Sequence, residues 1–217
     1  ALIKSAFERP QLRLTQRLKS GTQVPIREQP AQPAQIAGGL EPYTGPWTTA
    51  TAAHLYRRTT FGATPDQVAA AAAQGREASI SALFAPEPMP APPLTTSPDD
   101  TFTPFGQPWI NEPAGFDYNN ERHISLYSRS TGLQLNQPLS LREKMVLFWH
   151  NHFVVEEAVV EEARYMYRYF EVLRSHALGN FKTLCAASTV HPAMLAYLNG
   201  NSNIKEAPNE NYARELF

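Results

Sequence analysis

The stretch EEARYMYRYFEVLRSHALG, residues 161–179, decides the fold class of this chain. Apolar side chains recur in it at positions i, i+3, i+4 and i+7, which share one face of an α-helix. These side chains are Met166, Tyr169, Phe170 and Leu173. The stretch is therefore predicted to be a long amphipathic helix whose apolar face enters a core.

Helix start signals recur on both sides of this stretch. Thr64 is a favourable N-cap, Pro65 suits the first helical position and Gln67 completes a capping box. Ser140 and Glu143 have the spacing of a second capping box. No stretch alternates apolar and polar residues as a half-buried strand does. We therefore predict an all-α fold.

The predicted architecture is an irregular multi-helix domain with an extended N-terminal arm and a long proline-rich loop. We expect helices over residues 47–84 and 138–217, and no sheet of three or more strands. Asn180 is expected to cap a later helix whose inward-facing residues are Phe181, Leu184 and Cys185.

Length and composition limit the function classes. The 217 residues are 42% hydrophobic, which is enough for one domain with a core. The 19 basic and 20 acidic side chains balance, so bulk charge does not favour nucleic acid as a partner. No apolar run approaches the roughly 20 residues of a membrane-spanning helix. A single cysteine, Cys185, forms neither an internal disulfide nor a cysteine-based zinc site.

Two segments have no helical period. Residues 1–46, rich in Gln, Pro and Arg, predict an extended basic arm. This arm is either a disordered tail or a strap that becomes ordered on a partner. Residues 85–115 are too rich in proline for a helix, and their aromatic residues predict a loop that packs on another surface. We expect a protein partner to bind through these two segments.

The stretch FWHNHF, residues 148–153, places two histidines one residue apart. Side chains at i and i+2 do not meet on a helix, so we predict no metal held jointly by His150 and His152. His152 continues the apolar stripe of its helix, and it is expected to be almost fully buried. Its ring should lie edge-on to Trp149 or another aromatic ring, with one nitrogen bonded to a fixed acceptor. His150 should point toward the face that carries Glu143.

Residues 191–216 hold a second concentration of polar side chains. Several asparagines and Glu210 partly match a helix–loop–helix calcium loop, but Ile204 stands where that loop needs glycine. The alternative is an asparagine-rich turn that caps the next helix. Asn209, Glu210 and Arg214 sit together at the start of that helix, which is a favourable place for anions and polar ligands.

Five sequence blocks occur together in a fixed order: HLYRRTTFGATP (54–65), LREKMVLFWHNHFVV (141–155), LRSHALGNFKTL (173–184), HPAMLAYLNGNSN (191–203) and PNENYAREL (208–216). With these blocks the chain resembles the bacterial family called domain of unknown function 1800 (DUF1800), over about residues 47–217. The family's hallmark residues map onto His54, Arg57, Arg58, Trp149, His150, Asn151, His152, Asn209, Glu210, Asn211, Tyr212, Arg214 and Glu215.

The resemblance implies export to the periplasm, the cell surface or the extracellular space, commonly beside a sulfatase-like exported partner family. It implies no established activity, cofactor or catalytic residue. It also implies a domain that continues beyond Phe217, so we expect the remainder of that domain to pack on this part. The chain has His191, Asn199 and Gly200 in two places where related chains usually have aspartate, which argues against a metal role for that turn.

Two functions are compatible with these residues. The first is a non-catalytic binding or assembly module that uses the arm and the proline-rich loop as contact surfaces. The second is an exported hydrolase-type enzyme, with or without a metal, in which His150 or His152 is a general base and Glu210 a general acid or ligand. The candidate ligand-binding residues are Asn209, Asn211, Arg214 and Arg57. No cofactor is identified.

Overall fold

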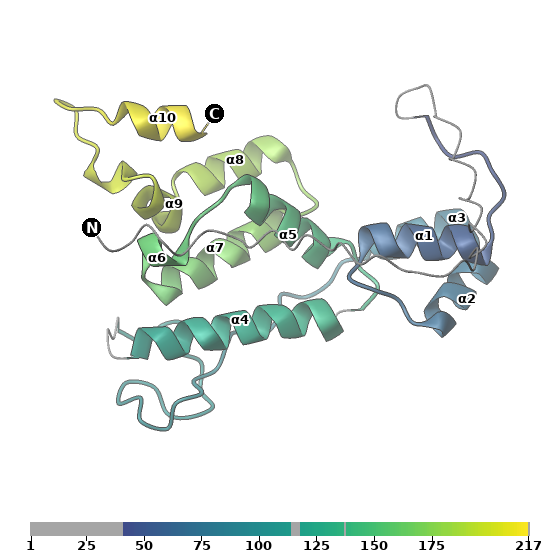
Figure 1. Cartoon of the computed structure of the whole chain (residues 1–217), viewed down its shortest axis with the longest axis horizontal. Coiled ribbons are helices and arrows are strands. Elements are labelled where there is room, and N and C mark those ends of the chain that lie inside the picture. Colours follow the sequence, from purple (N-terminus) through teal and green to yellow (C-terminus); the bar gives the residue numbers. More distant parts are fainter. Residues whose placement is uncertain (1–40, 114–117, 137, 217) are drawn as a thin grey trace, which may run out of the picture. The chain divides into compact units, whose positions relative to one another are not determined.

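The computed structural model describes residues 41–113, 118–136 and 138–216 (Figure 1). Residues 45–217 form one compact unit. The prediction for the arm at residues 1–46 lies outside the described residues, except for 41–46, which form neither helix nor strand. No described helix is both long enough and apolar enough to cross a bilayer.

The all-α prediction is confirmed. The described residues form helices and no β-strand, with only isolated bridges such as Leu94 with Pro108. The helices are α1 (Thr49–Thr59), α2 (Pro65–Gln74), α3 (Arg76–Leu83), α4 (Asn119–Asn136), α5 (Arg142–His152), α6 (Glu157–Val160), α7 (Ala163–His176), α8 (Phe181–Thr189), α9 (Pro192–Tyr197) and α10 (Glu210–Leu216), with a short 3-10 helix, η2 (Gly200–Ser202), after α9.

Helices α1 to α3 share a small core of their own. Its fully buried members are Ala52, Tyr56, Ala71 and Leu83. The predicted capping box of α2 is present, since Thr64 and Gln67 exchange side-chain and backbone hydrogen bonds. The backbone N–H of Leu141 donates to the carbonyl of Leu83 and so links the end of α3 to the start of α5.

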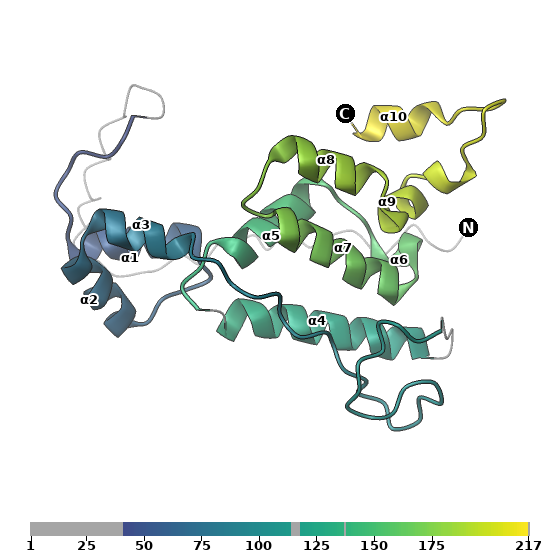
Figure 2. The same ribbon diagram turned by 180° about the vertical axis from the view of Figure 1, so that it is seen from behind.

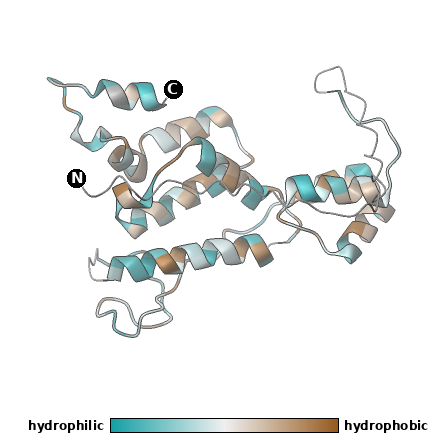
Figure 3. Ribbon diagram, in the orientation of Figure 1, coloured by the Kyte–Doolittle hydropathy of each residue, from teal (hydrophilic) through white to brown (hydrophobic). Residues whose placement is uncertain are grey.

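The larger core surrounds α7, which contacts α4, α5, α6, α8 and α9. Figures 1 and 2 show α7 beside α5 and α8 from opposite sides of the molecule. The predicted apolar stripe is confirmed at Met166, Tyr169 and Leu173, which are buried, while Phe170 is partly buried. Figure 3 shows the resulting alternation of hydrophobic and hydrophilic residues along α7.

Helix α4 and the proline-rich segment fold against each other. The indole of Trp109, fully buried, donates to the hydroxyl of Ser125 on α4. That hydroxyl in turn donates to the carbonyl of Leu94. Arg122 donates to the carbonyl of Pro113 and pairs with the buried carboxylate of Asp100. The described residues of the loop predicted at 85–115 therefore pack on their own chain.

Two local predictions are wrong. Ser140 and Glu143 form no capping box, because Glu143 turns inward to pair with Arg174, and the Ser140 hydroxyl accepts from the backbone N–H of Arg142 instead. Asn180 caps α8 and Leu184 is buried as expected, but Phe181 is 52% exposed. The rings next to Phe181 belong to the end of α5 and the residue after it, namely Trp149, His152 and Phe153.

Candidate functional site

His150 lies on the inner side of α5. Buried Glu143 is seven residues, or two turns, before it on the same face. The imidazole ring of His150 stacks on the ring of Phe170 in α7, with ring centroids 4.8 Å apart. The Nε2 atom of His150 is buried and has no hydrogen-bond partner among the residues that the structure describes. Burial lowers the pKa of the imidazole below its usual value, so the ring is neutral at pH 7.

His152 is exposed, which contradicts the expectation of burial. The predicted edge-on contact with an aromatic ring is present, with centroids 6.1 Å from Trp149 and 4.8 Å from Phe153. The reason for the error is the rotation of α5 about its axis: the helix buries Glu143 and Val146, which places His152 on the outer side. No hydrogen bond from His152 to a fixed acceptor is present in the described part of the chain.

The block at 208–216 forms a turn and the short helix α10. Asn209 accepts from the backbone N–H of Tyr212 and donates to the carbonyls of Leu198 and Asn199. The hydroxyl of Tyr212 donates to the carbonyl of Thr189. These contacts correspond to the predicted asparagine-rich turn that caps a helix.

The outer charges of this block are exposed. Glu210 and Arg214 form an i, i+4 pair on the surface, with nitrogen and oxygen 3.7 Å apart. The structure describes the backbone of Asn211 within α10 and not its side chain.

The structure does not bring His150 or His152 into one site with residues 208–216. Among the described side chains, no hydrogen bond or ion pair joins His150 or His152 to Glu210 or Arg214. Arg57 is exposed in the last turn of α1, where a positive charge is favourable at the C-terminal end of the helix dipole. Within residues 41–113, 118–136 and 138–216, no group of three His, Cys, Asp or Glu side chains could hold a metal ion.

His150→Phe is expected to raise the free energy of unfolding by about 1 kcal/mol, because a buried nitrogen without a partner is removed and the stack on Phe170 is retained. Urea unfolding of the full-length protein at pH 7 would measure this change. His152→Phe is the matched control, and it should change stability by less than about 0.5 kcal/mol because this position is on the surface. A clear loss of stability in His150→Phe would contradict the assignment of an unpartnered nitrogen.

Sequence reasoning missed the main buried polar feature, a row of six side chains of alternating charge that we call the charge chain. Its members, in spatial order, are Glu87, Arg142, Glu143, Arg174, Glu171 and Arg129. They come from the proline-rich segment, α4, α5 and α7. The charge chain therefore connects four separate parts of the fold.

The central pair of the charge chain is buried and bidentate. Arg174 donates from Nε to one oxygen of Glu143 at 2.6 Å and from Nη2 to the other at 2.9 Å. Only 1% of the Arg174 side chain and 6% of the Glu143 side chain is exposed. One sequence signal could have revealed the pair: Arg174 lies four residues after Phe170, on the inner edge of the α7 stripe.

The outer arginines of the charge chain hold the proline-rich backbone. Arg142 donates to the carbonyls of Glu87 at 2.8 Å and Pro88 at 3.0 Å. Arg129 donates to the carbonyls of Pro90 at 3.1 Å and Ala91 at 2.6 Å. These bonds satisfy carbonyl groups that an extended segment next to a core would otherwise leave without partners.

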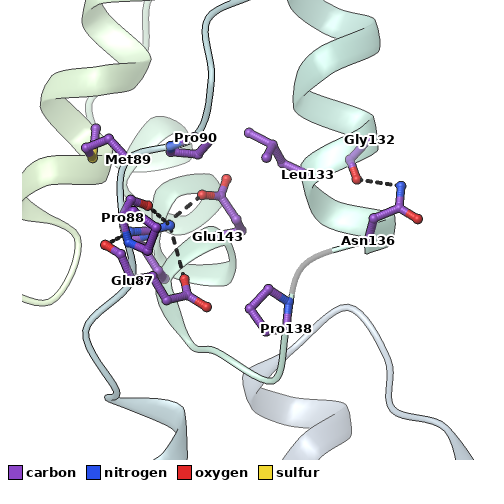
Figure 4. Close-up of a pocket in the computed structure, with 10 residues that line it drawn as sticks. Glu87, Pro88, Met89, Pro90, Gly132, Leu133, Asn136, Pro138 and Glu143 are labelled. Carbon is purple, nitrogen blue, oxygen red and sulfur yellow. Dashed lines mark hydrogen bonds and ion pairs between the residues drawn. The ribbon is translucent and has the colours of Figure 1, made fainter.

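A cavity of about 250 Å³ adjoins the charge chain (Figure 4). Its walls are residues 87–90, the last turn of α4 and the start of α5. Leu133 and Pro138 face the segment 87–90 across it. Its charged lining residues are already paired with one another, Glu87 with Arg142 at 3.1 Å and Arg142 with Glu143 at 3.8 Å. This arrangement is suited to holding the segment in place rather than to proton transfer.

A cluster of aromatic rings lies where α5 ends and α8 begins, and we call it the aromatic patch. Its members are Phe148, Trp149, His152 and Phe181. Phe148 is 54% exposed and Phe181 is 52% exposed. Trp149 lies between them, with its ring centroid 4.9 Å from that of Phe148 and 5.5 Å from that of Phe181. Its indole N–H donates to the carbonyl of Ala177, which fixes the ring.

Comparison with known proteins gives one family. The family model described as "Protein of unknown function (DUF1800)" matches residues 54–217 of the chain. No curated protein and no solved structure matches it.

Proposed function

The chain belongs to the DUF1800 family, described as protein of unknown function, and from this premise we propose that it is a non-catalytic binding module whose aromatic patch docks an apolar segment of a protein partner. We also propose that the chain is exported from the cytoplasm. Its partner would then be another protein of the cell envelope or extracellular space. The resemblance of the sequence blocks to exported family members supports that location.

The observation that carries this proposal is the exposure of Phe148 and Phe181 around a fixed tryptophan. Single exposed apolar residues are common on protein surfaces, but here two large rings meet the same indole. Aromatic residues are enriched at the centres of protein interfaces, where a rigid ring buries a large area at a low entropic cost.

The proline-rich segment provides a second candidate contact. Its backbone is held by the charge chain, yet Phe102 is 47% exposed and Phe105 is 67% exposed. The segment is thus fixed in place while its tip presents two phenylalanine rings. We propose this tip as an additional contact with the same partner.

The test uses the full-length protein in its native host, with a photo-crosslinking amino acid in place of Phe181. The partner protein captured by the crosslink is then identified and purified in its free form. Its affinity for the intact chain is measured. The double substitution Phe148→Ala and Phe181→Ala is expected to weaken binding at least about 10-fold, since each buried interface aromatic contributes about 1 kcal/mol or more.

Leu135→Ala is the matched control, because Leu135 is a 76% exposed apolar residue on α4, outside the patch. It should change the affinity by less than about 2-fold. Equal affinity of the double variant and the unsubstituted protein would overturn the proposed docking surface. Protease digestion of intact cells and of cells whose outer envelope has been opened tests export separately. Protection of the chain from protease in both samples would contradict export.

A further inference from the structure

His191 caps a helix by means of a nitrogen that protonation would remove as an acceptor. Its Nδ1 accepts from the backbone N–H of Ala193 at 3.2 Å, at the start of α9. A histidine nitrogen accepts a hydrogen bond only when it carries no proton, and both nitrogens of the charged ring are donors. The cap at α9 therefore requires the neutral imidazole.

The surroundings of His191 favour this neutral form. The residue is only 8% exposed, and its ring lies against that of Tyr169 on α7, with centroids 5.1 Å apart. Burial, and then the positive charge of Arg168 on α7, lower the pKa of the imidazole to about 4. The Tyr169 hydroxyl donates to the carbonyl of Phe153, and burial raises the pKa of this phenol, so it remains uncharged.

The other helices that contact α9 give the charged ring little compensation. On α6, the carboxylate of Glu157 accepts from the hydroxyl of Tyr127 and lies 3.7 Å from His123. On α8, the neighbouring residues Ser188 and Thr189 are neutral. The 3-10 helix η2 (Gly200–Ser202) contains no titratable side chain.

The chain after His191 depends on the position of α9. Asn209 donates to the carbonyls of Leu198 and Asn199, which directly follow α9. Tyr212 packs so closely on Gly200 that a Cβ atom at that glycine would lie 2.7 Å from the ring. Residues 198–216, which we call the C-terminal segment, are therefore linked to the end of α9 by side chains that fit one arrangement.

We propose that His191 is an acid-sensitive latch, whose protonation releases α9 and the C-terminal segment from α7 and α8. This inference is independent of the proposed function of the aromatic patch. The released histidine has its ordinary affinity for protons, whereas the docked one resists protonation. Released states therefore bind more protons, and docking weakens as the pH falls below the ordinary pKa of histidine.

The size of the effect follows from the two pKa values. With a pKa of about 4 when docked and about 6.5 when released, the docking equilibrium should be about 30-fold weaker at pH 5 than at pH 7.5. The loss should begin near pH 6.5 and should approach its limit near pH 4.

Hydrogen exchange of the full-length protein at pH 7.5 and pH 5 tests the latch, after correction for the intrinsic exchange rates. Amides of residues 193–198 should lose about 30-fold in protection at pH 5, while those of residues 166–173 on α7 stay protected. In His191→Asn the amide oxygen replaces Nδ1 as the cap and does not titrate, so the loss should shrink to less than about 3-fold.

Three results would overturn the proposal: unchanged protection of residues 193–198 at pH 5, an equal loss in His191→Asn, or a simultaneous loss throughout α7. His191→Asp is a second variant that retains a capping side chain, and it should keep the C-terminal segment docked at pH 5. If neither variant folds, the unsubstituted protein still decides the question, because only a loss confined to residues 192–216 supports a latch.

Discussion

Arg174→Ala is expected to lower the free energy of unfolding by about 3–5 kcal/mol, one of the two largest losses among the substitutions considered for this chain. The guanidinium group holds both oxygens of Glu143 in a buried, bidentate pair. Its removal leaves the Glu143 carboxylate buried, with Arg142 at 3.8 Å as its nearest remaining cation. Removal of one partner of a buried ion pair is strongly destabilising, because the remaining charge loses the hydrogen bonds that compensated for its burial.

Urea unfolding of the full-length protein, followed by circular dichroism, would measure the loss. Arg214→Ala is the matched control: its pair with Glu210 is exposed, so the change should be less than about 0.5 kcal/mol. The double substitution Glu143→Leu and Arg174→Met should recover most of the stability, because it removes both charges together. Equal effects of Arg174→Ala and Arg214→Ala would show that the buried pair does not stabilise the fold.

The second large effect is expected for Trp109→Ala, with a loss of about 3–5 kcal/mol. Trp109 is fully buried, contacts Tyr167 edge-on and donates to Ser125. Truncation creates a cavity between the proline-rich segment and α4, and it leaves the Ser125 hydroxyl with fewer partners. The same unfolding measurement applies.

Phe105→Ala is the control for this prediction, because Phe105 belongs to the same segment and is 67% exposed. It should change the stability by less than about 0.5 kcal/mol. Limited proteolysis adds a local measurement: Trp109→Ala should expose residues 94–113 to cleavage, whereas Phe105→Ala should not. Resistance of residues 94–113 in Trp109→Ala would mean that the arginine contacts alone hold the segment.

Helix α4 marks the limit of pattern reading in this chain. It is the longest described helix, yet its sequence NNERHISLYSRSTGLQLN contains no apolar stripe. Three of its buried residues are Arg122, His123 and Ser125, which are polar because they face the carbonyl groups of the proline-rich segment and α6. Hydrophobic periodicity identifies helices that pack on apolar surfaces, and α4 packs in part on a backbone.

A distant polar partner also explains why His150 faces inward and His152 is exposed, the reverse of the predicted burial. The sequence correctly placed His150 on the face of Glu143, but it could not show that this face is the inner one. A glutamate at that position normally predicts solvent, and only the presence of Arg174 on α7 makes its burial favourable. The charge partner comes from 31 residues farther along the chain, so local spacing contains no record of it.

The sequence by itself determined that this chain is helical, where several helices begin and to which family it belongs. Those features depend on short-range causes: the caps at Thr64 and Asn180, the apolar stripe of α7 and blocks of consecutive residues. Only the tertiary structure decided which face of α5 is buried, why α4 is a helix and which aromatic rings remain exposed. These depend on pairs such as Glu143 with Arg174 and Trp109 with Ser125, because a buried polar group is stable only where a distant residue supplies its partner.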